Sequence, residues 1–297
     1  MIDYEITLAA LEAKVDAISS TWRTRAAART ADFVLAGKYD EKSSIWSAIK
    51  SVYMELQGEA KCAFCERKLE SVDHGTGEQH VEHFRPKRQV EAWSVPDSLK
   101  PYSIVPAQPP ANNVGYYRLA YDLLNYCAAC APCNSVLKAS FFPIDAKAHD
   151  FGGTNITALN TKEKPLLIFP LGENAVKAED LIGFTGISPR AKKVTTSYDG
   201  RRALVTIELF KLDDTTRKNL ILERCRVVTT LFAQLELRRN PPSDRKRRRA
   251  QELIDACCSP KAPHTNCALS YVALYTSDQQ AAERYSDAAA DYLVSSS

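Results

Sequence analysis

The chain has 297 residues, which is enough to bury a hydrophobic core and falls between one and two average domains. Its formal net charge of +3, from 39 Lys and Arg against 36 Asp and Glu, is too small to indicate a nucleic-acid partner by itself. The first thirty residues lack the pattern of a secretory signal and no apolar run reaches membrane-spanning length, so we expect a cytoplasmic protein without membrane contact.

Two helices are predicted in residues 1–60, which we take as an N-terminal helical region. Apolar residues recur at three- and four-residue steps along one predicted helix face, namely Leu8, Leu11, Val15, Ile18 and Trp22. A second stripe comprises Ile45, Ile49, Val52 and Leu56. Gly58 suits the left-handed position that ends such a helix. We expect both stripes to serve core packing.

Cysteines, histidines and prolines crowd into residues 61–145, where regular apolar periodicity fades. Five prolines between positions 96 and 110 block both helix and central strand, so residues 96–113 are predicted to form a loop inside this region. Such a segment needs something other than a large core to hold it together.

Two Cys-x-x-Cys pairs near the ends of this region predict a zinc site on Cys62, Cys65, Cys130 and Cys133. Thiols remain reduced in a chain without an export signal, so closely spaced pairs favour metal binding over disulfides. Four thiolates leave zinc no open position for water, which makes this a structural site.

Two alternatives to this ligand set remain. Cys127 has the same spacing to Cys130 as Cys130 has to Cys133; we favour the later pair because Asn134 then directly follows the last ligand. A redox Cys-x-x-Cys fits less well, because thioredoxin-like motifs occur singly.

Residues 146–297 predict a mostly helical region. A strand is predicted at 203–209, followed by a helix from 213 or 214 to about 237. The basic run 245–249 and the apolar residues after it predict a basic amphipathic helix, which is either a solvated face or a nucleic-acid contact. The final segment, 266–297, is predicted to be helical.

A histidine motif lies between the cysteine pairs. The segment 80–87 reads His-Val-Glu-His-Phe-Arg-Pro-Lys; Asn125 follows the loop, and the second pair continues into Asn134 and Lys138. Together with the cysteine pairs, this pattern resembles the four-cysteine branch of the HNH endonucleases. More closely, the chain resembles the HNH endonucleases of Septu-type and retron-associated anti-phage systems. This resemblance rests on the segments Val-Glu-His-Phe-Arg-Pro-Lys and Cys-Asn-x-x-x-Lys, together with Phe142-Pro143. The clear resemblance covers about residues 61–144.

The resemblance implies a ββα-metal fold in which a hairpin carries Glu82 and His83. It implies that His83 is the general base, for which an imidazole with a pKa near neutrality is suited, and that Asn125 orients it. Glu82 and Asn134 would bind a catalytic Mg²⁺ or Mn²⁺ that is distinct from the zinc. Successive strand residues face opposite ways, so Glu82 and His83 share a site only if the hairpin bends there.

Further roles are less specific. Arg85, Lys87 and Lys138 are predicted to contact the phosphate backbone of the substrate. Asn125 has an alternative role as a turn or capping residue. The role of His80, as a metal ligand or as a residue behind one, is left open.

We therefore predict an α+β fold, with a zinc-stapled ββα HNH nuclease module at 61–145 between helical flanks at 1–60 and 146–297. The C-terminal flank is expected to include a short strand or hairpin and to contact DNA or a partner. The predicted function is metal-dependent DNA cleavage in an anti-phage system with a partner ATPase. The alternatives are a non-catalytic zinc-knuckle nucleic-acid-binding or adaptor subunit and an RNA-directed nuclease.

Overall fold

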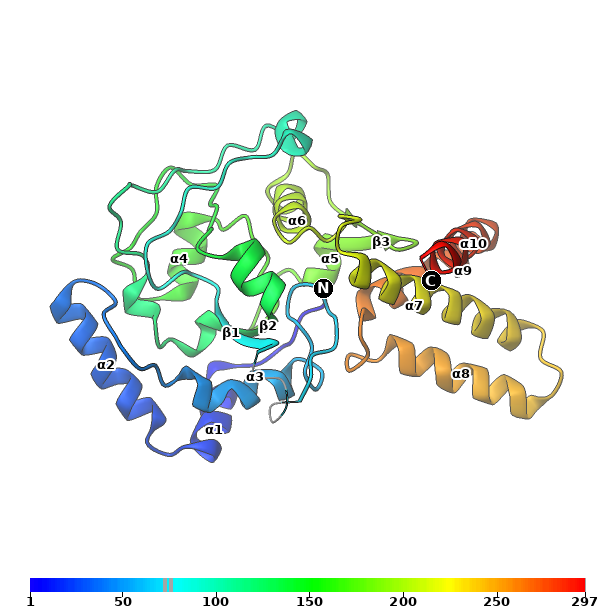
Figure 1. The fold of residues 1–297 in the computed structure, drawn as a ribbon, viewed down its shortest axis with the longest axis horizontal. Coiled ribbons are helices and arrows are strands. Elements are labelled where there is room, and N and C mark those ends of the chain that lie inside the picture. Colours follow the sequence, from blue (N-terminus) through cyan, green and yellow to red (C-terminus); the bar gives the residue numbers. More distant parts are fainter. Residues whose placement is uncertain (72–73, 75–76, 297) are drawn as a thin grey trace.

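The computed structural model describes residues 1–71, 74 and 77–296. Within them the fold is α+β, with ten α-helices and four short strands in two separate two-stranded antiparallel sheets. Residues up to α6 form a rounded body, and the last four helices extend from one side of it (Figure 1). In the described part of the chain, no helix is both long enough and apolar enough to span a bilayer.

The first predicted helix is two helices, α1 (Leu8–Ile18) and α2 (Trp22–Ala36). The chain turns between them, so the predicted single apolar face is split. Leu11, Val15 and Trp22 are buried, whereas Leu8 and Ile18 are exposed. The single-stripe prediction is therefore wrong at Leu8 and Ile18, the two end residues of α1, because only Leu11 and Val15 of that helix face the core.

The second predicted helix is confirmed as a 3-10 turn, η1 (Trp46–Ile49), followed by α3 (Lys50–Leu56). Gly58 follows it with φ +64°, and a Cβ atom built there would lie 2.3 Å from the carbonyl oxygen of Pro260. Both the left-handed backbone and the close approach of the C-terminal region require glycine at this position.

The first sheet pairs β1 (Gln79–His83) with β2 (Tyr126–Cys130), so that Gln79 lies opposite Cys130 and His83 opposite Tyr126. The chain then enters η5 (Pro132–Lys138), a helical turn with the wider π-type hydrogen bonding. The long connection between the strands contains only short 3-10 turns among its described residues: η2 (Asp97–Tyr102), η3 (Tyr117–Leu119) and η4 (Leu123–Asn125). The loop predicted at 96–113 is thus confirmed apart from η2.

The C-terminal region contains α4 (Ile156–Glu163), α5 (Ala178–Leu181), β3 (Ile182–Thr185), β4 (Ser188–Ala191), α6 (Tyr198–Leu209), α7 (Lys218–Arg239), α8 (Asp244–Cys258), α9 (Thr265–Ser277) and α10 (Gln279–Ser295). The strand predicted at 203–209 is wrong, because these residues lie in α6. Ser197 caps that helix, and Ala203, Thr206 and Leu209 are buried at helical spacing. The hairpin of this region is β3–β4.

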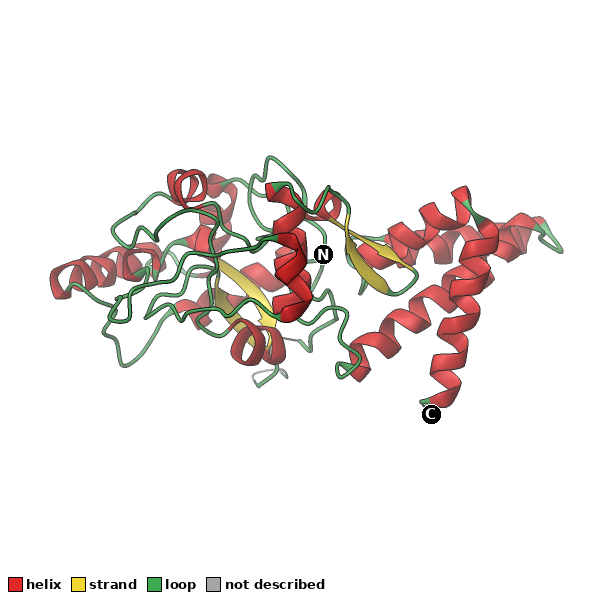
Figure 2. Ribbon diagram, turned by 90° about the horizontal axis from the view of Figure 1, so that it is seen from above, coloured by secondary structure: helices red, strands yellow, loops and turns green. Residues whose placement is uncertain are grey.

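The last helices form a bundle around α7, against which α8, α9 and α10 all pack (Figure 2). The predicted basic helix is confirmed as α8, with Ala250 and Ile254 buried on its inner face. The predicted start of α7 is four or five residues early, since the helix begins at Lys218.

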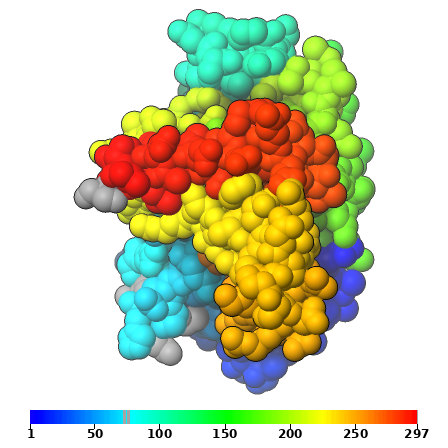
Figure 3. All heavy atoms as spheres, turned by 90° about the vertical axis from the view of Figure 1, so that its right-hand side faces the viewer, coloured from blue at the N-terminus to red at the C-terminus, as the bar shows by residue number. Residues whose placement is uncertain are grey.

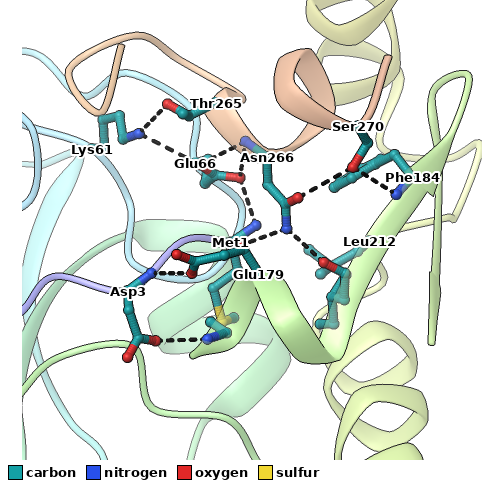
Figure 4. Close-up of polar contacts among 12 residues, drawn as sticks. Met1, Asp3, Lys61, Glu66, Glu179, Phe184, Leu212, Thr265, Asn266 and Ser270 are labelled. Atoms are coloured by element: carbon teal, nitrogen blue, oxygen red, sulfur yellow. Dashed lines mark hydrogen bonds and ion pairs between the residues drawn. The ribbon is translucent and has the colours of Figure 1, made fainter. Parts of the chain in front are cut away.

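A buried polar network connects the first cysteine pair with the start of the chain and with α9 (Figure 4). Glu66 accepts from the Met1 ammonium group at 2.5 Å. Lys61 donates from Nζ to the Thr265 hydroxyl at 2.8 Å. Asn266 donates from Nδ2 to the Met1 carbonyl at 2.7 Å. The cysteine region and the C-terminal bundle are therefore joined by specific contacts as well as by packing.

Candidate metal centre and reaction cleft

Four cysteines come together as predicted. The sulfur atoms of Cys62, Cys65, Cys130 and Cys133 lie within 4.8 Å of one another, and all four residues are buried. Cys127 is outside this group, so the choice of the later pair is confirmed. Four converging thiols are the ligand set of a structural zinc ion.

Local hydrogen bonds shape the first knuckle and attach it to the sheet. The Cys62 amide donates to the carbonyl of Arg67, and the Cys62 carbonyl accepts from the Glu66 amide, both at 3.0 Å. Glu66 has φ +60°, which tightens the turn. The amide of Ala63 donates to the carbonyl of Ala128 in β2 at 3.0 Å. The sheet thus fixes one cysteine pair relative to the other.

The C-terminal region also contacts the cysteine cluster. Arg217 donates from Nη2 to the sulfur of Cys133 at 3.6 Å. Burial opposes the charged form of Arg217, yet the neighbouring cysteine sulfurs raise the pKa of its guanidinium. The Phe64 ring, between the first two cysteines, stacks on Phe210 with centroids 4.0 Å apart. The cluster is therefore packed against the segment between α6 and α7.

A cleft of about 260 Å³ opens where β1 ends and η5 begins. Its border includes Val81, Glu82, His83, Lys87, Arg88 and Asn134. The two residues before the loop and Asn134 after it are thus brought to one site. Glu82 and His83 both border the cleft, although they are successive residues at the end of a strand.

His83 is held from several sides. Its Nε2 lies 3.1 Å from the carbonyl oxygen of Ala120, which can only accept, so Nε2 carries the proton and Nδ1 is the basic nitrogen. Lys87 Nζ lies 3.5 Å from Nδ1. Burial, reinforced by the charge of Lys87, holds the pKa of His83 well below its usual value. The imidazole is therefore neutral at pH 7.

Glu82 is buried and paired with a lysine that was predicted to bind substrate. Lys138 Nζ lies 2.5 Å from Glu82 Oε1 and donates to the carbonyl of His83 at 2.9 Å. Burial raises the pKa of Glu82 although Lys138 opposes the shift. The Lys138 side chain is fully buried. The predicted phosphate contact is therefore not available to Lys138, which instead holds the end of β1.

Arg85 likewise lies inside the protein. Its Nε is 3.1 Å from Glu163 Oε2, and its Nη2 donates to Asn160 Oδ1 at 2.8 Å. Tyr116 donates to the other Glu163 oxygen at 2.6 Å. The guanidinium lies 5.0 Å from the centre of the Phe142 ring. Arg85 is fully buried, so the predicted backbone contact is replaced by an ion pair that anchors the segment after His83.

Asn125 holds the backbone beside His83 and hydrogen-bonds to main-chain groups, not to the imidazole. Its Oδ1 accepts from the Arg85 amide at 2.8 Å, and its Nδ2 donates to the carbonyls of Arg85 (3.0 Å) and Leu119 (3.1 Å). The direct hydrogen bond expected between Asn125 and His83 is replaced by this clamp across the two ends of the loop. It fixes where the chain leaves β1.

Two aromatic residues next to the cleft were not predicted as part of the site. Trp46 packs edge-on against His83 with centroids 4.8 Å apart. Lys87 Nζ lies 4.5 Å from the centre of the Trp46 ring, and the Arg88 guanidinium 5.1 Å from that of Tyr39. Both aromatic residues belong to the N-terminal region, where the sequence indicated only core packing.

The other histidines of this region lie elsewhere. His80 is half-buried in the middle of β1 opposite Ala129. It belongs neither to the cysteine cluster nor to the border of the cleft. His74 is exposed in a turn.

The donors at the cleft fit a hard divalent cation. Glu82 Oε1 is bound by Lys138, which leaves Oε2 as a donor. Asn134 uses Nδ2 to bind the Ser135 hydroxyl at 3.0 Å, so its amide oxygen is available. Mg²⁺ is commonly bound by one or two carboxylates, waters and substrate phosphates. Glu82 and Asn134 border the same cleft as Lys87 and Arg88.

Comparison with known proteins finds one informative relative. The chain is 24% identical over 203 residues to the Septu protein PtuB of Bacillus mycoides, an alignment that covers 66% of this chain and 61% of that protein. The chain thus spans about three fifths of the length of this relative. No family model matches the sequence. No solved structure matches it either.

Proposed function

We propose that this chain is a divalent-metal-dependent HNH endonuclease that hydrolyses phosphodiester bonds in DNA. The observation that carries the proposal is that Glu82, His83 and Asn134 border one cleft although a long loop separates the first two from the third. The order of strand, strand and helix around them agrees with the ββα-metal arrangement of that superfamily. The similarity to Septu protein PtuB supports the same choice.

His83 is the general base of the proposed reaction. Its Nε2 proton is bound by the Ala120 carbonyl, so the Nδ1 lone pair takes the proton from an attacking water. The water oxygen forms a bond to phosphorus while the bond from phosphorus to a sugar oxygen breaks. Burial keeps the imidazole neutral before the reaction, as a base requires.

A hard cation bound by Glu82 and Asn134 would stabilise the negative charge that develops on the phosphate and the leaving oxygen. Lys138 keeps Glu82 in place from behind, and it pairs with only one carboxylate oxygen. Lys87 and Arg88 border the same cleft and supply positive charge for the phosphate backbone. The chain therefore offers both signs of charge where the substrate would lie.

Zinc bound by the four cysteines has a different proposed role, which is to hold the module together. Binding free energy at such a site is largely folding free energy when the ligands come from a small segment. Since one cysteine pair precedes β1 and the other begins at Cys130, the last residue of β2, their metal would fix the hairpin that carries Glu82 and His83.

We further propose that the protein acts in anti-phage defence together with a partner ATPase. Two observations support this role. Sequence segments of this chain resemble those of Septu-type endonucleases, and the chain is similar to Septu protein PtuB. Coexpression with a candidate partner ATPase tests it: we expect copurification in a fixed ratio. Recovery of the chain alone at low salt and physiological concentration would contradict the partnership.

The exposed face of α8 is the proposed contact for DNA or the partner. Residues 245–249 are all basic and exposed, and the helix stands at the front of the face shown in Figure 3. Arg247 and Arg249 pair with carboxylates on the same helix. Arg245, Lys246 and Arg248 have no ion-pair partner among the described residues, so their charges are available.

The decisive experiment is cleavage by the purified chain. Supercoiled plasmid and single-stranded RNA are incubated with Mg²⁺ or Mn²⁺, with and without the partner. We expect nicked or linear DNA, and no such product without a divalent cation or with Glu82→Gln. Cleavage of RNA but not of DNA would show that the substrate is RNA. Tight DNA binding with no cleavage under any of these conditions would favour a non-catalytic binding subunit.

A further inference from the structure

We infer that Trp46 and Tyr39 of the N-terminal region form an aromatic wall behind the residues that line the reaction cleft, and that Trp46 is a positioning residue for His83 and Lys87. The inference deepens the proposed nuclease function and rests on it. Trp46 begins η1, outside the segment that carries the cysteine and histidine motifs. Its ring meets the proposed base in a T-shaped contact, and the neighbouring lysine lies over its face.

His83 is enclosed by two rings that meet it at nearly right angles. Trp46 approaches at 4.8 Å with an interplanar angle of 86°, and Tyr126 at 4.9 Å with an angle of 83°. The Ala120 carbonyl holds Nε2, and the Tyr126 hydroxyl donates to the same carbonyl at 2.5 Å. Tyr126 belongs to the sheet, whereas Trp46 comes from the N-terminal region. Without Trp46, the imidazole would lose the contact on one side.

The same aromatic wall contacts the two cationic side chains of the cleft, Lys87 and Arg88. Lys87 Nζ lies 4.5 Å from the Trp46 ring centre and 5.6 Å from that of Tyr39. The Arg88 guanidinium lies 5.1 Å from the Tyr39 ring centre. Ammonium and guanidinium groups over aromatic faces are attracted by the ring quadrupole. The rings therefore set where positive charge stands relative to the basic nitrogen of His83.

The wall is anchored to the module by Tyr121. Its ring lies 5.7 Å from Trp46 and stacks on Phe33 at 6.0 Å. Its hydroxyl accepts from the Ile45 amide at 3.2 Å, directly before Trp46. Trp46 itself is only half-buried, unlike the core residue Trp22, which is 1% exposed. Core filling alone does not explain a half-buried ring between the proposed base and a cation.

The test compares Trp46→Leu, which removes the aromatic face and edge, with Trp46→Phe, which keeps a smaller ring. Trp93→Leu is the matched control, since Trp93 is buried and does not border the cleft. We expect Trp46→Leu to lower kcat by roughly 10-fold to 100-fold, because an ångström of misplacement can cost about that much. We expect Trp46→Phe to restore most of it. Trp93→Leu should lower Tm while leaving kcat and KM of the folded protein unchanged.

Two readouts do not depend on cleavage. The ring nitrogen signals of His83 in NMR should move in Trp46→Leu and return toward wild type in Trp46→Phe. DNA affinity without added divalent cation should weaken in Trp46→Leu, because the Lys87 ammonium group is no longer positioned by the indole ring. Wild-type kcat, affinity and His83 signals in folded Trp46→Leu would overturn the inference. A wild-type chain that cuts nothing contradicts the proposed function instead, and the NMR and affinity measurements still decide the role of Trp46.

Discussion

The cysteine cluster and the reaction cleft share a hairpin and a helical turn, yet they are assembled in different ways. The cluster uses one residue type from two short motifs, and all four side chains are buried. The cleft combines a carboxylate, an imidazole, an amide and two cations, and the N-terminal region packs against it. A closed site of identical ligands suits a structural metal, whereas an open site of mixed charge suits a reacting phosphate. Stability should therefore depend on the first and cleavage on the second.

The largest expected effect is on stability, from Cys133→Ala. Losing one of four zinc ligands should release the metal and destabilise the protein by more than about 5 kcal/mol, since loss of a structural metal is among the most damaging changes. Thermal melting and zinc content measure it. Cys127→Ala is the control, because Cys127 is buried but outside the cluster. If Cys133→Ala keeps its zinc and its Tm, the ligand set is wrong.

The second-largest effect is also on stability, and it tests whether Arg85 stabilises the fold or binds substrate. Arg85→Leu leaves Glu163 buried and unpaired, which should cost about 3–5 kcal/mol. Chemical denaturation measures this cost. The exposed pair of Arg23 with Asp16 provides the control, and Arg23→Leu should leave the free energy of unfolding nearly unchanged. A small loss in Arg85→Leu together with a clear loss of DNA affinity would restore Arg85 to the substrate-binding residues.

A smaller effect concerns the charge of the cleft. Burial lowers the pKa of Lys87 to about 8, so its ammonium is present below that pH and is lost as the pH rises through it. DNA affinity without divalent cation should fall roughly fivefold between pH 7 and pH 9, which corresponds to about 1 kcal/mol, the upper end for one exposed ion pair. Fluorescence anisotropy measures it. Lys87→Met should bind weakly at both pH values; an unchanged pH dependence in that variant would assign the titration to another group.

The smallest effect is expected far from the cleft, on α8. Each neutralised phosphate contact lowers the slope of log affinity against log salt by about 0.9. Arg245→Gln with Arg248→Gln should therefore lower the slope by up to about 2 without changing kcat. The control is Arg249→Gln, whose charge is paired with Glu252. If the slope is unchanged, the basic face of α8 does not bind DNA and is left as the partner contact.

The cysteine cluster could be predicted from sequence because ligand spacing is local. The approach of Asn134 to Glu82 and His83 was implied by resemblance, since a long loop separates them. Arg85 and Lys138 were misplaced because a basic side chain in a motif suggests a surface. Their buried partners, Glu163 and Glu82, are defined only by the fold.

The fold shows the same limit. A strand was predicted at 203–209, but these residues lie in α6, where the Ser197 cap and the buried helical face stabilise a helix. Trp46 was missed for a related reason: the apolar stripe around it accounted for packing, and nothing in the spacing indicated its contact with His83.

The separation of the two sites is tested most directly by one measurement on His83→Ala: the divalent-dependent rate of DNA cleavage, together with zinc content and Tm of the same preparation. We expect the rate to fall by at least about 100-fold, since a general base contributes that much, while zinc per chain stays at the wild-type value. Tm should fall moderately because His83 is buried, and the protein should remain folded. Cleavage at the wild-type rate would contradict the assignment of His83 as the base. Loss of zinc in this variant would contradict the independence of the cleft from the cysteine cluster.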